Sequence, residues 1–132
     1  MRQLAEKLKN LERKIATAKG PFSLFALFLR ENGQDKWDLV ASAPWLEKDK
    51  KEGMSYLADE LRSTLQPDEL LSLSRIVLAE SDDPGLEAVQ RAVKAEHGLV
   101  EVTNCNFFSL EIKRAFIITS QRQVDPVVRE AS

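Results

Sequence analysis

Apolar residues recur at alternating spacings of three and four through the first nineteen residues of the chain. This is the period of one face of an α-helix, and Gly20-Pro21 ends the pattern, because glycine suits the position after a helix and proline cannot continue one. The sequence therefore predicts an amphipathic helix over residues 1–19. The residues of its apolar seam are Met1, Leu4, Leu8, Leu11, Ile15 and Ala18.

Residues 22–30 are apolar at both alternating sets of positions, which is typical of a strand covered on both faces. We therefore expect a central strand here, with Phe25 and Phe28 buried on opposite faces. The pair Asn32-Gly33 is a turn signal, and a second strand pattern over 37–43 follows it. The two segments together predict an antiparallel hairpin.

The middle of the chain alternates helical and strand patterns. Apolar residues again recur at three and four over 49–65, which predicts a second helix, and 67–71 can add one helical turn. A short apolar run over 74–79 then predicts a buried strand. Asp83 precedes Pro84 as a helix-capping residue would, and Gly98 marks the far end of a third helix.

The remaining segments predict strands over 99–102 and 107–119, with a turn over 103–106 between them. The second of these strands is long enough to suggest a bulge near Lys113-Arg114, or two joined strands. Asp125-Pro126 can begin one final turn of helix within the polar tail.

These elements predict the α+β class: a mixed sheet with helices packed on it, in the order α-β-β-α-β-α-β-β. We expect a single domain over residues 1–132, because splitting a chain of this length would leave pieces too small to bury a useful core. It comprises the amphipathic helix (1–19), an α/β body (20–120) and a polar tail (121–132).

Cysteine and histidine usage limits the chemistry that we expect. One cysteine excludes an internal disulfide framework and a cysteine-based zinc cluster, and one histidine disfavours a histidine-rich metal centre. We therefore expect no cofactor. The first residues form no signal-peptide core, and the longest apolar stretch, 22–29, is far below the roughly 20 residues that cross a bilayer. These features predict a soluble, cytoplasmic protein with no membrane contact.

The net charge of −2 conceals an asymmetry. Residues 1–19 hold six basic and two acidic side chains, a net charge of +4, whereas the rest of the chain carries −6. A basic helix and an acidic body attract each other, within one chain or between two copies. Because so short a helix is marginal in isolation, its seam must also be buried, either on the chain's own sheet or in a partner. We expect a protein partner or a second copy, and the predicted partner-binding residues are Leu4, Leu8, Leu11 and Ile15.

Glu111 and Lys113 form the strongest candidate for an enzyme site. Alternate residues of a strand share one face, so the pair matches the Glu-x-Lys half of a metal-dependent nuclease site. Such a site also needs an aspartate on a neighbouring strand, for which Asp38 is the candidate. The same two residue types are common on any exposed strand face.

Other polar and aromatic residues have a structural and a functional interpretation. Asp82-Asp83 lies where ligands often bind in open sheets, but a helix cap explains Asp83. Cys105 and His97 are candidates for a thiol–imidazole pair, or for a small packing residue and a residue at a helix C-terminus. The aromatic residues near the predicted hairpin can anchor a partner or belong to the core; they are Trp37, Trp45 and Tyr56.

We therefore expect a non-enzymatic interaction or regulatory protein that associates with itself. One alternative is a small nucleic-acid-binding regulator that uses the basic helix, although an acidic body opposes docking on phosphates. The second alternative is a metal-dependent nuclease that uses Glu111 and Lys113.

Overall fold

The computed structural model of the protein describes residues 2–31 and 35–122. The turn expected at Asn32-Gly33 and the helical turn expected at Asp125-Pro126 lie outside these residues. The described elements, in chain order, are α1 (Arg2–Lys19), β1 (Leu24–Arg30), β2 (Trp37–Ser42), α2 (Pro44–Lys48), α3 (Lys50–Thr64), α4 (Pro67–Leu71), β3 (Leu73–Leu78), α5 (Pro84–Ala92), β4 (Val100–Phe107) and β5 (Leu110–Ser120).

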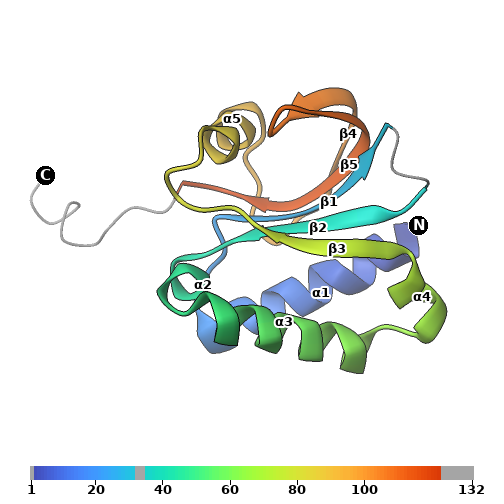
Figure 1. Cartoon of the computed structure of the whole chain (residues 1–132), viewed down its shortest axis with the longest axis vertical. Helices are drawn as coiled ribbons and strands as arrows, with labels where there is room; N and C mark the ends of the chain where they lie inside the picture. The colour runs from blue at the N-terminus through green and yellow to red at the C-terminus, as the bar shows by residue number, and fades with distance from the viewer. Residues whose placement is uncertain (1, 32–34, 123–132) are drawn as a thin grey trace, which may run out of the picture.

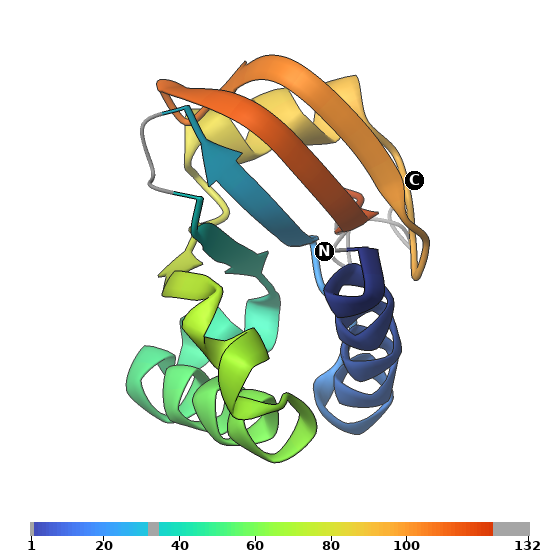
Figure 2. The same ribbon diagram turned by 90° about the vertical axis from the view of Figure 1, so that its right-hand side faces the viewer.

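The five described strands form one mixed sheet in the order β3-β2-β1-β5-β4. β1 pairs antiparallel with β2 and with β5, β4 pairs antiparallel with β5, and β2 and β3 are parallel. Figures 1 and 2 show α1 and α3 on one face of this sheet and α5 on the other. The predicted α+β class, element order and β1–β2 hairpin are confirmed.

β1 is the central strand and is covered on both faces. Phe25 belongs to the core beneath α1 and α3, and Phe28 belongs to the core beneath α5; both are fully or almost fully buried. Phe28 also contacts two rings of the β4–β5 hairpin, Phe107 and Phe108, at centroid distances of 5.8 and 6.2 Å. The prediction of a central strand covered on both faces is therefore confirmed. Each alternating set of its side chains packs against a separate helical layer.

The seam of α1 packs on the chain's own sheet. Leu8 and Ile15 are fully buried, and the core that they enter includes Phe25 of β1 and Phe116 of β5. Four residues of the seam are 0–4% exposed, whereas Ala18, near the end of the helix, is exposed. This burial favours the alternative, in which the seam belongs to the chain's own core, and partner binding by these residues stays a prediction. The residues concerned are Leu4, Leu8, Leu11 and Ile15.

The basic side chains of α1 are also used within the chain. Lys7 donates to Glu69 of α4 at 2.8 Å, and Lys14 Nζ lies 3.3 Å from Glu60 of α3. The hydrogen bond from Lys7 holds the pKa of the Glu69 carboxyl below its usual range. The attraction between basic helix and acidic body thus acts inside one copy, where the two charged surfaces lie side by side.

The third helix ends earlier than predicted, at Ala92. Beyond it the backbone is extended, and Ala95 exchanges two hydrogen bonds with Ser120, at 3.0 and 2.8 Å. The end of β5 offers unpaired backbone groups at this point, and pairing with them competes with another turn of helix. Gly98 consequently does not cap a helix; its N–H donates to Ile118 O at 2.9 Å.

The turn between the last two strands lies at Phe108-Ser109 and not at 103–106. Both residues have positive φ, 56° and 60°, as the two central residues of a type I′ hairpin require. Asparagine or glycine usually signals such a turn, and a bulky residue rarely adopts this conformation. Phe108 packs so closely on Gly85 that an alanine Cβ there would lie 2.3 Å from its ring. Tertiary packing therefore sets this turn. The bulge predicted near Lys113-Arg114 is present, at Lys113.

We expect Leu8→Ala to lower the free energy of unfolding by about 2–5 kcal/mol, because it leaves a cavity in a closed core. The matched control is Asn10→Ala on the exposed side of the same helix, for which a change within about 0.5 kcal/mol is expected. Urea unfolding monitored by circular dichroism measures both. Equal effects of the two substitutions would mean that the seam is not part of the core.

Candidate functional site

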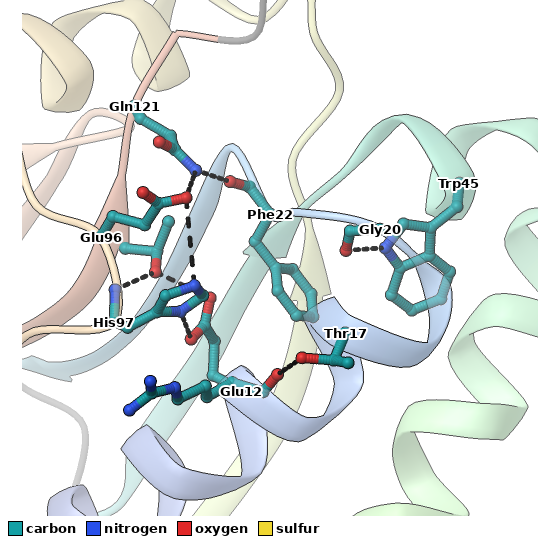
Figure 3. Close-up of polar contacts among 10 residues, drawn as sticks. Glu12, Thr17, Gly20, Phe22, Trp45, Glu96, His97 and Gln121 are labelled. Atoms are coloured by element: carbon teal, nitrogen blue, oxygen red, sulfur yellow. Dashed lines mark hydrogen bonds and ion pairs between the residues drawn. The ribbon is translucent and has the colours of Figure 1, made fainter.

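A buried carboxylate joins α1 to the sheet. Glu12 is 0% exposed; its Oε1 lies 2.6 Å from His97 Nδ1, and its Oε2 accepts a hydrogen bond from Thr119 Oγ1 at 2.8 Å. Figure 3 shows Glu12 and His97 facing each other from α1 and from the loop before β4. A buried carboxylate without partners is strongly unfavourable. Here both oxygens have one, so the network connects three segments that lie far apart in the sequence.

The loop conformation fixes the imidazole of this network. His97 has a φ of 52°, and its backbone N–H donates to Thr119 Oγ1 at 3.1 Å. Nδ1 faces Glu12 Oε1, and when the carboxylate is ionised it only accepts, so the hydrogen bond then requires a proton on Nδ1. The other ring nitrogen, Nε2, lies 4.0 Å from Glu96 Oε2, which in turn accepts from Gln121 Nε2 at 3.1 Å. The imidazole is therefore held at Nδ1 and through the backbone N–H of His97, whereas Nε2 lies beyond hydrogen-bonding distance of Glu96.

A carboxylate that holds a histidine is the arrangement that orients a general base. A nucleophile would have to lie within hydrogen-bonding reach of Nε2, where the described structure has the carboxylate of Glu96. The Thr119 hydroxyl is fully buried and already donates to Glu12. The described geometry thus supplies the base half of a nucleophilic site without a nucleophile. We interpret the network as the polar part of the contact between α1 and the sheet.

The candidate thiol–imidazole pair of His97 and Cys105 does not form. Cys105 pairs with Ile112 in the β4–β5 ladder, whereas His97 contacts Thr119, seven residues further along β5. At the rise of a strand this is a separation of roughly 20 Å. Burial raises the pKa of the Cys105 thiol, which disfavours the reactive thiolate. The placement of His97 at a helix C-terminus is also wrong, since α5 ends five residues before it.

The predicted nuclease residues do not come together. Asp38 and Ala115 flank Phe28 on its two sides, and Glu111 lies four residues further along β5. Lys113 is the bulged residue of β5, and it is exposed together with Glu111. Within residues 2–31 and 35–122, no three acidic, histidine or cysteine side chains are close enough to hold a metal ion.

Asp38 instead forms the centre of an ion-pair group on three strands. It is 2% exposed, and its Oδ2 lies 2.9 Å from Arg30 Nε and 3.3 Å from Arg75 Nη2. Two cations therefore compensate the one buried charge. The arginine of β3, Arg75, contributes to this group although about half of its side chain is exposed.

Two other predicted residues have structural roles. Asp83 caps α5, with its side chain accepting from Gly85 N–H at 2.8 Å. Trp37 is buried against Phe116, at a centroid distance of 5.4 Å, and so belongs to the core. Trp45 and Tyr56, by contrast, are only partly buried and form a corner between α2 and α3.

A hollow of about 540 Å³ lies between the end of α5 and the end of β5, beside the Glu12 network. Its lining contains three cations, Arg91, Lys94 and Arg122, and the acids Glu87 and Glu96. Arg91 is already paired with Glu87 at 2.6 Å. Because both signs line the hollow, its charge selects no class of ligand.

The two outer strands of the sheet differ in their chemistry. β4 exposes polar side chains along its length, and Asn104, with a φ of 51°, interrupts its regular backbone. β3 has a single charged residue, Arg75, and this side chain contacts Asp38. Leu71, the last residue of α4 and two residues before β3, is 70% exposed, the large apolar side chain that stands out among the described residues. β3 is therefore an apolar edge with little of the charge that normally protects a free strand.

The sequence pattern does not predict the burial of Glu12, which lies at the border of the seam, directly after Leu11. A glutamate at such a position is usually solvated, so its residue type does not signal burial. The partners that permit its burial are 85 and 107 residues away. Only the folded chain brings them together.

We expect the Glu12–His97 contact to show as a coupling free energy of about 1–3 kcal/mol in a double-mutant cycle of Glu12→Gln and His97→Gln. Each single substitution removes one partner of a buried, charged hydrogen bond and should be destabilising. A parallel cycle of Glu96→Gln with His97→Gln is the control, for which coupling within about 0.5 kcal/mol is expected. Additive effects in the first cycle would contradict the role of this contact.

In comparisons with known proteins, no family model, no curated protein and no solved structure matches the chain. None of the described helices is long and apolar enough to span a membrane.

Proposed function

We propose that this chain is a protein-interaction protein that associates with itself through the free edge of β3. The observation that carries the proposal is the chemistry of that edge. β3 is an outer strand of the sheet, and from Leu73 to Leu78 it has one charged residue, Arg75, which is ion-paired with Asp38. Unpaired backbone groups on an apolar edge are a ready template for another strand.

Backbone alternation identifies the groups that are available for pairing. The N–H of Ala79 donates to Ala41 O of β2 at 2.9 Å, so the backbone of Ala79 points toward β2. Alternate residues of a strand point the same way. The N–H and C=O groups of Ile76 and Leu78 therefore point toward the free side of the sheet.

A second copy of the chain suits this edge for two reasons. Pairing two β3 strands antiparallel across a two-fold axis is a closed, self-complementary arrangement, the commonest one among soluble oligomers. In the register that places Ile76 of one copy opposite Ile76 of the other, Arg75 lies opposite Val77. Like charges therefore do not face each other across the interface. The exposed Leu71 lies next to the same edge and gains a surface to cover it.

The alternatives have less support from the geometry. For nucleic-acid binding, Lys7 and Lys14 of the basic helix already pair with Glu69 and Glu60. For a nuclease, Glu111 and Lys113 are exposed without a neighbouring aspartate, as described above. Association by the seam of α1 would require undocking this helix from its own core. The β3 edge needs no rearrangement.

We expect the full chain to be a dimer at about 100 µM in sedimentation equilibrium, and Ser74→Lys to weaken the dimer at least about tenfold. Ser74 is an exposed residue of β3, and a lysine there places a charge against the apolar edge of the second copy. Thr103→Lys, at an exposed residue of β4, is the matched control and should leave the dimer unchanged.

Hydrogen exchange supplies a second measurement. The amides of Ile76 and Leu78 should become protected as the protein concentration rises, and should lose this protection in Ser74→Lys. A monomeric parent protein, or equal effects of the two lysine substitutions, would rule out the β3 edge as the interface.

A further inference from the structure

The corner between α2 and α3 forms a small hollow with two aromatic walls. The ring centroids of Trp45 and Tyr56 are 6.0 Å apart, and the ring planes are nearly perpendicular, at 88°. Asp49 and Glu52, at the start of α3, line the same hollow, which has a volume of about 190 Å³. The two rings meet in an edge-to-face arrangement, and an aromatic face next to two carboxylates forms a site of negative potential.

Contacts with the end of α1 hold this corner in place. Trp45 Nε1 donates to Gly20 O at 3.1 Å, and its ring contacts Phe22 at a centroid distance of 5.6 Å (Figure 3). On the other side, Gly53 lets α3 approach α2 closely: a Cβ there would lie 2.7 Å from Leu46 Cδ2. The ring of Trp45 is therefore already fixed in the free protein. The close approach of α2 explains why a glycine, Gly53, lies inside α3.

A cation of the chain itself already uses this site. Lys19 Nζ lies 4.8 Å from the centroid of the Tyr56 ring, within the range of a cation–π contact. Lys19 is the last residue of α1, and its side chain is exposed. Its ammonium group is strongly hydrated, so leaving the ring costs little. This contact indicates that the hollow accepts an ammonium group. The hollow holds the Lys19 ammonium only weakly.

We propose that the hollow between Trp45 and Tyr56 is a binding site for an alkylammonium group, with Lys19 as a displaceable internal occupant. A methylated ammonium is the form that fits best. Its methyl groups contact both rings and its spread charge is less hydrated than that of a primary ammonium, which favours binding to aromatic faces. The volume suits one such head group. Such a group can come from a free small molecule or from a methylated lysine side chain of another protein.

The test is a titration of the full-length protein followed by the indole N–H signals of its two tryptophans in an NMR spectrum. Tetramethylammonium chloride should shift the signal of Trp45 with saturation. Trp37, in the core, is the internal control and should not shift. 3,3-Dimethyl-1-butanol, a neutral molecule of similar shape to choline, and sodium chloride at equal ionic strength should leave both signals in place.

Three substitutions test the roles of the lining residues. Lys19→Met removes the internal occupant and should tighten tetramethylammonium binding by about three- to tenfold, whereas Tyr56→Leu should weaken it by a similar factor. Glu52→Gln should weaken binding a few-fold, because it removes a carboxylate from the lining. An unchanged Trp37 signal reports that each variant is folded.

Two further ligands separate the sources of the ammonium group. Choline represents a free small molecule, and N-acetyl-Nε-trimethyllysine amide represents a side chain; tighter binding of one assigns the source. Equal shifts of the Trp45 signal with tetramethylammonium and with the neutral 3,3-dimethyl-1-butanol would overturn the proposal. An unchanged affinity for tetramethylammonium in Lys19→Met would also overturn it. These measurements do not depend on the oligomeric state, so they stand or fall separately from the β3 interface.

Discussion

The burial of β1 on both faces is the constraint on which the rest of the structure depends. Its side chains from Leu24 to Leu29 are all buried, so each face of the sheet needs its own apolar layer. α1 and α3 supply one layer, and α5 with the curled β4–β5 hairpin supplies the other (Figures 1 and 2). The amphipathic helix at the start of the chain is thus part of the fold: without it, α3 alone would cover this face of the sheet.

The polar contacts of α1 follow from that docking. On one side of the helix its lysines face the acids of α3 and α4, and on another side Glu12 reaches His97 and Thr119 inside the protein. Apolar burial supplies most of the driving force, whereas directional hydrogen bonds select one orientation of the helix. A carboxylate that must meet two partners tolerates little rotation or sliding. The histidine in this network is therefore better explained by specificity of packing than by catalysis.

The surfaces that remain for function lie away from this network. One is the β3 edge, where backbone groups and apolar side chains reach the solvent on the same strand. The other is the corner of Trp45 and Tyr56, where rings and carboxylates surround a lysine of the chain itself. They use different physical chemistry: strand pairing at the first, and cation–π attraction at the second. Each can therefore be removed by substitution without altering the other.

The sequence by itself determined the elements whose signals are local. The seam of α1, the doubly apolar pattern of β1, the cap at Asp83 and the bulge at Lys113 all follow from spacing and residue type, which neighbours along the chain decide. The class and order of the fold follow from the same patterns. The sequence also showed the charge asymmetry, although not the surface that neutralises it.

Tertiary structure alone decided which segments meet. The seam has the same period whether its own sheet or a second copy covers it, so only the assembled core distinguishes the two. The turn at Phe108-Ser109 has no local signal, because its positive φ angles are stabilised by packing on Gly85, more than twenty positions earlier in the chain. The end of α5 was set by backbone pairing with Ser120, and the burial of Glu12 by partners at the other end of the chain. Each of these outcomes depends on contacts between residues distant in sequence, which a periodic pattern does not encode.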